Sequence, residues 1–593
     1  MDQANRGDAP PSARWGAGLT AAGVDVERRT KVLAGLSQWW AEHPDDRPAI
    51  DVLVAEGRWD LIVDCFGEVL PFGTGGRRGT VGIGPNRFNP TTLCASVVGH
   101  VATMRKERPH GQLSVVIAFD VRRYDDLRGA LPRPLNPLLG LRSADFGRMA
   151  AEVYAALGVR VWMPPEDSLS TPELCFAIRA LGADGGLNVS ASHNPPDDNG
   201  GKIYGPTGGQ RVPPDDQRLA EAVAAVSGAP RLPIAEARAA GLVEDIPPHV
   251  FLDYARSNAA LLPPGPRGPR IVLTNLHGTG DRTVLPALQQ AGFSVRLVPE
   301  QAAHDGAFPT VPFAAPNPEV PESLGLAIAL AEAEGAALVL GCDPDADRVG
   351  LAARVWPDRP GLAAWRNFHG QELAALITLA ALRLRPPGAP SLVLTTEVTT
   401  GLVRAAAEAQ GAACLDHLLV GFKYIGAAMD ALAAGALPEA PGLDLRAFAV
   451  GVEESHGALI NPTLRDKDAV SGALALAHLA AVEAEAGRSL LDTLDDLHRE
   501  HGLFVNILMN MTMRGAAGRA QIQAVSAGLR AAPPEHLGGR RVLRFADRRD
   551  PTGPLGPHLS ETDRVGRDVL VWWLEGGARL VLRPSGTEPK SKL

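Results

Sequence analysis

The stretch AALVLGCDPDADRVG, residues 336–350, joins an apolar segment to a polar turn. Five small or apolar residues form a candidate strand, and a polar turn with three aspartates follows at once. Ligands of α/β proteins bind beyond the carboxyl ends of strands, so a polar turn in this position predicts a strand and a site together. The same arrangement recurs elsewhere along the chain.

Apolar segments of strand length alternate with Ala/Leu/Glu-rich segments of helical length. The candidate strands are 113–118, 271–274, 336–340, 392–395 and 447–450, and clear helical segments are 216–226 and 468–486. This alternation predicts α/β layers. The stretch 568–590 instead predicts two strands joined at Glu575-Gly576-Gly577. Pro/Gly clusters at 261–270, 385–390 and 437–442 are interpreted as boundaries between domains or elements.

The length, net charge and composition of the chain argue against several classes of protein. A chain of 593 residues is too long for one core and should form about three to five domains. A net charge of −9 argues against nucleic-acid binding, and no apolar run is long enough to predict a membrane span. The first residues lack the apolar core of a secretion signal, and the five scattered cysteines show no metal or disulfide spacing. We therefore expect a cytoplasmic protein, and interpret the final Ser-Lys-Leu as chance or truncation rather than a peroxisomal signal.

The aspartates of the first turn, Asp343, Asp345 and Asp347, predict a site for a hard cation such as Mg²⁺ or Ca²⁺. Three carboxylates this close repel one another unless a cation or solvent relieves them. An EF-hand is excluded because Arg348 and Arg354 occupy its glycine and glutamate positions. A solvated acidic turn is the alternative without function. A strand followed by Asp-x-Asp also occurs in haloacid-dehalogenase-like phosphatases, which leaves Asp343 open as a nucleophile.

Three further turns carry chemistry. LNVSASHNPPDDNGGKIYG, residues 187–205, places Ser192, His193 and Lys202 in a glycine-rich loop, with a capped surface turn as the alternative. Glu453 and Ser455 follow a candidate buried strand and could bind sugar hydroxyls, although Glu-Glu-Ser is also an ordinary helix start. The stretch 583–590 could cradle a phosphate. Together the four turns describe phosphoryl transfer on a sugar phosphate.

These turns resemble four loops of the α-D-phosphohexomutases, in that family's order. SASHNP (190–195) is similar to their phosphoserine loop, DPDADR (343–348) to their metal loop, GVEES (451–455) to their sugar-binding loop and RPSGTEPK (583–590) to their phosphate-binding loop. FGTGGRRG (72–79), GPNRFN (84–89), LHGTG (276–280) and VGFKYI (420–425) match as well. The start and length are most similar to the long branch of phosphoglucomutases and phosphopentomutases.

The resemblance implies three α/β domains of shared topology with mixed sheets, and a smaller C-terminal α+β domain, around a central cleft. The implied division is a helical extension (1–69), domain 1 with the phosphoserine loop (70–245), domain 2 with the metal loop (246–365), domain 3 with the sugar-binding loop (366–495) and domain 4 with the phosphate-binding loop (496–593). The family continues past that loop with a strand and helix, whereas this sequence has three residues after Lys590. Whether domain 4 is truncated stays open.

The resemblance also implies roles. Ser192 carries a phosphoryl group in the resting enzyme, and Mg²⁺ binds to it and to Asp343, Asp345 and Asp347. Lys202 and His193 exchange the substrate proton, while Arg348 and Arg78 steady the phosphoserine. The residues expected to bind substrate are Glu453, Ser455, Arg583, Ser585, Gly586, Thr587 and Lys590.

The implied reaction interconverts a sugar 1-phosphate and 6-phosphate through a bisphosphorylated sugar, with sugar 1,6-bisphosphate as activator. Glucose phosphate is the first expectation, ahead of mannose and pentose phosphates. His456-Gly457 departs from the glycine-histidine order of many hexomutases, which leaves the sugar preference open. We expect a small-molecule substrate, no nucleic-acid or membrane partner, and a monomer or small homo-oligomer.

Overall fold

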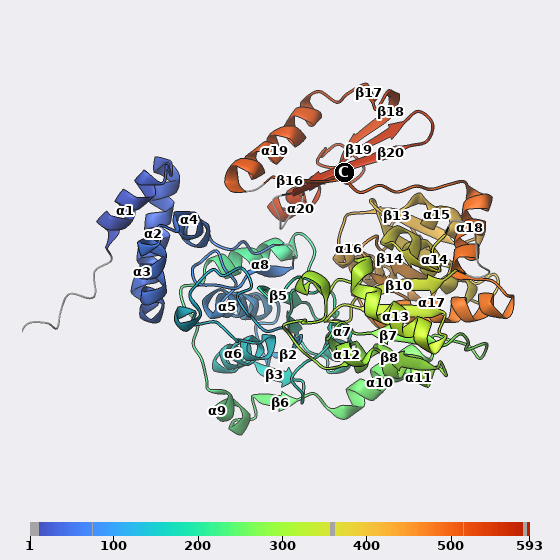
Figure 1. Ribbon diagram of the computed structural model, residues 1–593, viewed down its shortest axis with the longest axis horizontal. Helices are drawn as coiled ribbons and strands as arrows, with labels where there is room; N and C mark the ends of the chain where they lie inside the picture. The colour runs from blue at the N-terminus through green and yellow to red at the C-terminus, as the bar shows by residue number, and fades with distance from the viewer. Residues whose placement is uncertain (1–10, 74, 356–361, 514, 585–589) are drawn as a thin grey trace, which may run out of the picture.

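The computed structural model describes residues 11–73, 75–355, 362–513, 515–584 and 590–593. Four sheets follow one another along the chain, preceded by a group of helices (Figure 1). The helices are α1 (Ser12–Ala21), α2 (Val26–Glu42), α3 (Arg47–Ala55) and α4 (Trp59–Phe66). They enclose their own apolar core, which includes Trp15, Leu19 and Leu36. This group corresponds to the helical extension expected before residue 70.

The first sheet has the strand order β1-β5-β4-β2-β3-β6 and is mixed. β2, β3, β4 and β6 run parallel, and β5 and β1 are added antiparallel at one edge. The strands are β1 (Gly76–Thr80), β2 (Ser114–Phe119), β3 (Arg160–Met163), β4 (Gly185–Val189), β5 (Asp198–Tyr204) and β6 (Val243–Asp245). The helices are α5 (Pro90–Glu107), α6 (Ser143–Ala156), α7 (Thr171–Ala180), α8 (Asp215–Ala224) and α9 (Ile234–Ala239).

The second sheet, in the order β11-β10-β9-β7-β8, is also mixed. β7, β8 and β9 are parallel, whereas β10 and β11 are antiparallel additions. The strands are β7 (Ile271–Thr274), β8 (Val295–Leu297), β9 (Leu338–Cys342), β10 (Val349–Arg354) and β11 (Trp365–Phe368). The helices are α10 (Pro248–Ala259), α11 (Val284–Gln290), α12 (Pro299–Ala302) and α13 (Gly325–Glu334). Sheets one and two share a parallel centre that is extended at one edge by two antiparallel strands.

The third sheet has the order β13-β12-β14-β15. Its strands are β12 (Leu392–Thr396), β13 (Ala413–Leu418), β14 (Phe448–Val452) and β15 (Ala458–Leu459). Its helices are α14 (Gly370–Arg383), α15 (Gly401–Ala409), α16 (Phe422–Ala433), α17 (Ala469–Glu485) and α18 (Leu490–His501). Within the described residues no single helix is long and apolar enough to cross a bilayer; α17 and α18 together pass such a test but meet at a 90° bend.

The fourth sheet is antiparallel, in the order β16-β21-β20-β19-β18-β17. It contains β16 (Asn510–Thr512), β17 (His536–Leu537), β18 (Arg540–Asp547), β19 (Leu570–Leu574), β20 (Arg579–Pro584) and β21 (Lys590–Lys592), with α19 (Gly515–Ala531) and α20 (Glu561–Gly566). β19 and β20 are the hairpin predicted around residues 575–577. The fold is therefore three α/β units and a β-rich C-terminal unit, as expected.

Two of the expected domain boundaries fall inside elements. β11 pairs with β10 of the second sheet, so the boundary expected after residue 365 divides a strand. The boundary expected after residue 495 lies within α18. β11 and α18 each belong to the unit that precedes the expected boundary, because their apolar residues pack on that unit's core. We keep the division as a proposal, with these two boundaries moved to the ends of β11 and α18.

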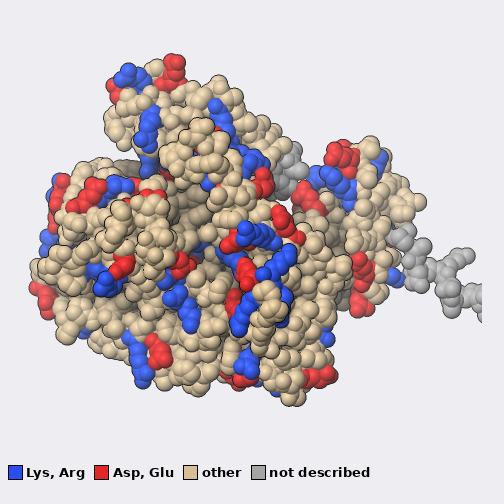
Figure 2. All heavy atoms as spheres, turned by 180° about the vertical axis from the view of Figure 1, so that it is seen from behind, with Lys and Arg blue, Asp and Glu red and all other residues tan. Residues whose placement is uncertain are grey.

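Contacts between units hold the C-terminal sheet in place above the other three (Figure 1). Arg548 donates to both oxygens of the buried Glu397 carboxylate in the third unit, with Nε at 2.7 Å. Thr562 at the start of α20 donates through Oγ1 to Asp216 of α8 at 2.6 Å. The rear surface is hollowed beneath this unit, and acidic and basic side chains are interspersed over that face (Figure 2).

Candidate active site

The site lies where four strands end. Asp120, Ser190, Asp343 and Glu453 directly follow β2, β4, β9 and β14. Because β2 and β4 are parallel neighbours with Phe119 opposite Val189, the residues that follow them meet at one sheet edge. Ser190 therefore lies beside Asp120, and its Oγ donates to Asp120 Oδ2 at 2.8 Å.

The metal turn is folded around its first aspartate. Asp343 accepts hydrogen bonds at Oδ1 from the backbone N–H groups of Asp347 (3.1 Å) and Arg348 (3.2 Å). Ala346 adopts a left-handed conformation with φ of 50°, which turns the chain back. The carboxylate oxygens of Asp343, Asp345 and Asp347 come within 4.8 Å of one another, and all three residues are buried.

The chemistry of this cluster fits a cation. Oδ1 of Asp345 and both carboxylate oxygens of Asp347 are buried and accept no hydrogen bond. A buried oxygen without a hydrogen bond is costly, and converging carboxylates are preferred ligands of hard divalent ions. The three aspartates can therefore hold a metal ion.

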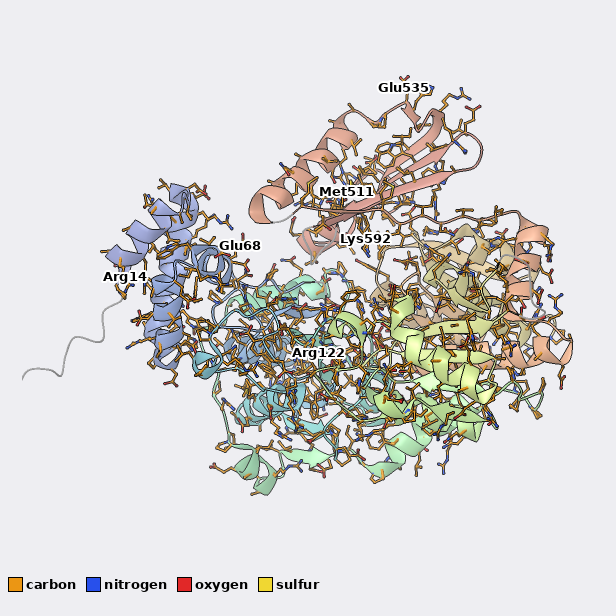
Figure 3. The ribbon with its side chains drawn as sticks, in the orientation of Figure 1. Arg14, Glu68, Arg122, Met511, Glu535 and Lys592 are labelled. Atoms are coloured by element: carbon orange, nitrogen blue, oxygen red, sulfur yellow. The ribbon has the colours of Figure 1, made fainter. Side chains whose placement is uncertain are left out.

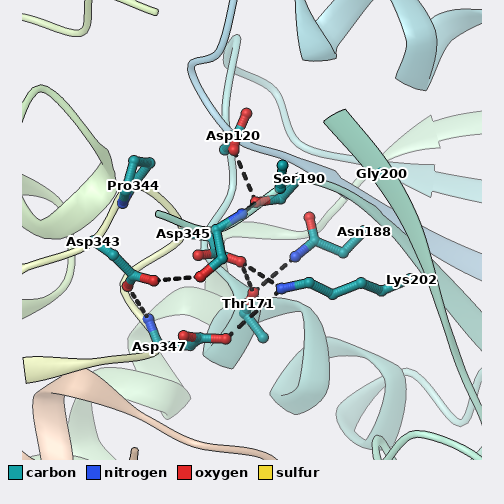
Figure 4. A network of polar contacts seen from close by, with 12 residues as sticks. Asp120, Thr171, Asn188, Ser190, Gly200, Lys202, Asp343, Pro344, Asp345 and Asp347 are labelled. Atoms are coloured by element: carbon teal, nitrogen blue, oxygen red, sulfur yellow. Dashed lines mark hydrogen bonds and ion pairs between the residues drawn. The ribbon is translucent and has the colours of Figure 1, made fainter. Parts of the chain in front are cut away.

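Ser192 faces this cluster across the boundary between the first and second units. Its Oγ donates to Asp343 Oδ2 at 2.6 Å, and the residue is buried. Lys202 of β5 approaches from the same side and donates to Asp345 Oδ2 at 2.8 Å (Figure 4). The structure thus brings together the serine, the lysine and the aspartate triad.

Burial and charge oppose one another at the carboxylates. Burial raises the pKa of Asp343 well above its usual value, and the neighbouring Asp347 and Asp345 raise it further. Burial would also raise the pKa of Asp345, but the Lys202 ammonium and the Thr171 hydroxyl lower it far below the usual range. For Lys202, burial disfavours the charged form, yet Asp345 and Asp347 raise its pKa overall. Lys202 is therefore an ammonium ion in this arrangement.

The groups expected to assist Ser192 lie around it. His193 Nδ1 is 3.4 Å from Ser192 Oγ, and burial together with Arg348 and Arg78 lowers its pKa well below the usual value. Arg78 donates to the Ala191 carbonyl and the Asn194 side chain of the same loop. Arg348 Nε lies 3.6 Å from Asp347 Oδ1. The imidazole is thus neutral, and both guanidinium groups border the serine loop and the metal turn.

The sugar-binding loop is joined directly to the metal turn. The backbone of Arg348 forms an antiparallel bridge with Gly457, and the Val349 N–H donates to the His456 carbonyl at 3.2 Å. Ser455 Oγ donates to Glu453 Oε1 at 2.7 Å. His456 is buried, and its Nδ1 lies 3.1 Å from the Val349 carbonyl oxygen. The residue that departs from the hexomutase order is thus packed against β10.

The expected phosphate-binding loop is only partly described. Ser585, Gly586 and Thr587 lie outside the described residues, and Lys590 is described only as the first residue of β21. Arg583 is half-buried on β20 and pairs in register with Lys592. Within the described part of the chain, no hydrogen bond or ion pair joins Arg583 to the serine loop or the metal turn. The assignment of this loop stays a prediction.

Two residues of the site were missed in the sequence. Lys467 reaches the metal turn from the third unit, with Nζ 3.0 Å from Asp347 Oδ2. Thr171, the first residue of α7, donates through Oγ1 to Asp345 Oδ2 at 2.8 Å. The available signals were the run Asp466-Lys467-Asp468 before a long apolar helix and the capping box at Ser170. Neither indicates by itself that the residue faces an aspartate cluster more than a hundred positions away.

Three α/β/α units, a β-rich fourth unit, and a serine facing an acidic triad define the phosphosugar mutases as a class. The phosphoglucomutase/phosphomannomutase family models for α/β/α domains I, II and III match residues 141–228, 249–356 and 369–500. These matches cover more than half of the chain. The chain belongs to the phosphoglucomutase/phosphomannomutase family, whose members are isomerases.

Individual relatives agree with this assignment. A Staphylococcus epidermidis protein named phosphoglucomutase is 31% identical over 88% of this chain and 90% of its own length. A Haemophilus influenzae protein named "Probable phosphomannomutase" is 31% identical over 81% of this chain and 87% of its own length. The open form of the Paramecium phosphoglucomutase parafusin shares the fold at a TM-score of 0.57 with 16% identity, covering 88% of this chain and 92% of that one.

Proposed function

We propose that this chain interconverts glucose 1-phosphate and glucose 6-phosphate through a phosphorylated Ser192 and a glucose 1,6-bisphosphate intermediate. The observation that carries the proposal is the 2.6 Å approach of Ser192 Oγ to Asp343 of the acidic triad. A serine hydroxyl is a weak nucleophile by itself, and a cation beside it provides the charge compensation that phosphoryl transfer requires.

The proposed metal ligands are Asp343, Asp345 and Asp347, with Ser192 or its phosphate completing the site. Mg²⁺ is the cation favoured by an all-oxygen donor set beside a phosphoryl group, and when bound it supplies positive charge to the phosphoryl oxygens. The buried oxygens without hydrogen bonds support this assignment.

The chemistry consists of two transfers. In the first, the bond between phosphorus and Ser192 Oγ breaks, and phosphorus bonds to a free hydroxyl oxygen of the sugar phosphate. The proton of that hydroxyl passes to the neutral His193 imidazole, or to the Lys202 amine once the Lys202 ammonium has given its proton to Ser192 Oγ. After the bisphosphate reverses its orientation, Ser192 Oγ accepts the other phosphoryl group and the isomeric monophosphate remains. The activator, glucose 1,6-bisphosphate, phosphorylates Ser192 whenever the phosphoryl group has been lost.

Substrate orientation is assigned to two loops. Glu453 and Ser455 belong to the loop that bridges to Arg348 through Gly457, and they bind hydroxyls present in both orientations of the sugar. Arg583, Ser585, Gly586, Thr587 and Lys590 bind the phosphate that is not reacting. Arg78 and Arg348 steady the phosphoserine through their positions beside its loop.

Glucose phosphate is favoured because the relative with the longest match cited above is named a phosphoglucomutase. Mannose phosphate is the second candidate, supported by the name of the Haemophilus relative, and pentose phosphate the third. We also propose a cytoplasmic protein that acts as a monomer or small homo-oligomer. A phosphatase with Asp343 as nucleophile has weaker support, since it gives no role to the buried Ser192 hydroxyl that donates to Asp343.

The test supplies Mg²⁺, glucose 1-phosphate and a trace of glucose 1,6-bisphosphate, and follows glucose 6-phosphate and free phosphate in parallel. We expect glucose 6-phosphate with almost no free phosphate. Free phosphate alone would instead establish the phosphatase. Ser192→Ala should lower turnover by at least about 10³-fold because it removes the atom that carries the phosphoryl group; retention of activity within a few-fold would reject Ser192 as nucleophile.

A further inference from the structure

The backbone of the serine loop is held in an unfavourable conformation. Ser192 has φ of 54°, in the left-handed region that residues other than glycine rarely adopt. Such a conformation persists only where surrounding contacts hold it, and it occurs preferentially at functional sites. The contacts that hold this loop come from groups that the proposed mechanism does not use.

Arg122 is the first of these groups. It follows β2, is fully buried, and lies at the centre of the molecule (Figure 3). Its guanidinium donates to the carbonyl oxygens of Ser192 (2.5 Å), Asn194 and Pro195 (2.6 Å). One planar cation therefore fixes three carbonyls of a single turn, which a flexible ammonium cannot do with the same geometry.

Arg122 is itself held from both sides. Its Nε lies 3.3 Å from Asp120 Oδ2, and this ion pair is completely buried. On the side of the second unit its guanidinium lies 5.3 Å from the centre of the Phe308 ring. The charge is thus paired and its orientation restricted, as a buried cation requires.

Asp120 connects this cation to the loop by a second route. Its Oδ2 accepts a hydrogen bond from Ser190 Oγ at 2.8 Å, and Ser190 Oγ accepts the backbone N–H of Ser192, also at 2.8 Å (Figure 4). The C=O of Ser192 therefore binds Arg122 directly, and its N–H is linked to Asp120 through Ser190. Both backbone groups are held by the same buried ion pair. Asp120 Oδ1 accepts from Ser143 Oγ at 2.6 Å, and Ser143 Oγ accepts from the Asn199 side-chain amide at 3.0 Å, not from the backbone N–H of Ser192.

We infer that Asp120, Arg122 and Ser190 form a positioning unit that holds Ser192 in its left-handed conformation and aims Oγ at the metal turn. None of the three contacts the reacting atoms. The inference rests on the proposed transfer through Ser192, and it predicts that loosening the unit slows phosphoryl transfer without weakening substrate binding.

The sharpest test compares Ser190→Ala with Ser143→Ala in the full chain. Both substitutions remove a fully buried hydroxyl that donates to Asp120 and accepts one further hydrogen bond. Ser190 accepts it from the Ser192 backbone N–H, whereas Ser143 accepts it from the Asn199 side-chain amide. Ser190→Ala should lower kcat by about tenfold or more with KM unchanged, because small misplacement of a reacting group is costly. Ser143→Ala should stay within about twofold. Ser190→Thr, which keeps the hydroxyl, should restore most of the rate.

Phosphorylation of Ser192, measured by intact mass after mixing with glucose 1,6-bisphosphate, is the second readout. The rate of phosphoserine formation should fall in Ser190→Ala and not in Ser143→Ala, whatever the two variants lose in unfolding stability. Equal kcat losses in the two variants, or an unchanged kcat in Ser190→Ala, would overturn the inference while the proposed function stands. A wild-type chain that neither forms phosphoserine nor isomerises the sugar phosphate overturns both.

Arg122→Lys provides an independent measurement. The substitution keeps the charge beside Asp120 but replaces a planar fork with a point donor, so the loop loses its shared anchor. We expect kcat to fall by about tenfold with KM unchanged. If this variant does not fold, the comparison of Ser190→Ala with Ser143→Ala alone tests the inference. If it folds and retains the wild-type kcat, the role given to Arg122 is wrong.

Discussion

The Nζ atom of Lys467, in the third unit, lies 3.0 Å from the Oδ2 atom of Asp347, in the second unit. The ammonium is almost completely buried, and its ion pairs with Asp347 and Asp466 outweigh the cost of burial and raise its pKa. The acidic turn is therefore balanced by cations from two other parts of the chain, Lys202 from the first unit and Lys467 from the third. The site forms only when all three units are assembled.

Lys467→Met should lower kcat because it removes a positive charge beside the proposed metal ligands. The same change should tighten the binding of Mg²⁺, because a cation no longer repels the incoming ion. Titration of each variant with Mg²⁺ by calorimetry measures the affinity directly. Lys31→Met, at an exposed helical pair, is the matched control and should change neither quantity. Weaker Mg²⁺ binding in Lys467→Met would contradict this account.

Mg²⁺ should raise the thermal midpoint of unfolding. An ion that binds only the folded state contributes about 2.7 kcal/mol at a hundred times its dissociation constant. Asp345→Asn should abolish the shift, since it removes a carboxylate from the cluster, and Oδ1 of Asp345 is one of the buried oxygens without a hydrogen bond. Asp550→Asn, an aspartate bound to Thr552 in an exposed turn, should leave the shift intact. An equal shift in all three proteins would place the ion elsewhere.

His100 should make the fold sensitive to acid. It is fully buried beside the Tyr154 hydroxyl, and burial lowers its pKa to about 3, with a smaller contribution from Arg211. Below pH 6.5 the unfolded chain takes up this proton and the native state does not, so stability is complete above 6.5 and falls as the pH decreases. Between pH 7 and 5 the loss is about 2 kcal/mol.

Denaturant unfolding of wild type and His100→Gln at both pH values checks this dependence. His100→Gln has no proton to take up at this position, so its loss of stability between pH 7 and 5 should be smaller by that amount. His110→Gln, at an exposed position, is the control and should keep the wild-type dependence. The same loss in His100→Gln as in wild type would show that other groups cause the acid sensitivity.

Thr562→Val should loosen the C-terminal unit. Thr562 donates to Asp216, a buried carboxylate that also binds Lys423 of the third unit at 2.8 Å. A hydrogen bond to a charged group contributes about 1.5–3 kcal/mol, so the docked arrangement should weaken by tenfold or more. We expect a larger radius of gyration in solution scattering and a raised KM. Thr552→Val, which removes a hydroxyl bond inside the same unit, should leave both unchanged.

The sequence predicted most of the strand positions that carry the site. The segments expected at 271–274 and 392–395 correspond to β7 and β12, and the hairpin around 575–577 to β19 and β20. The strand expected at 336–340 is observed at Leu338–Cys342, two residues later, because the buried Gly341 and Cys342 extend its pairing with β7 and β10 up to the first aspartate. Apolar runs between polar turns determine that strands exist, but their ends depend on pairing with neighbouring strands.

The chemistry of each loop could be predicted from the sequence: a hydroxyl at 192, carboxylates at 343, 345 and 347, and the order in which they occur. Each of these is a local pattern of a few residues that follows a strand. Which groups from distant loops meet depends on the folded chain. Lys467, Thr171 and the buried pair of Asp120 and Arg122 act on residues 70 to 174 positions away or in another unit. Such contacts depend on how sheets pack and on strand register, and no local pattern specifies either.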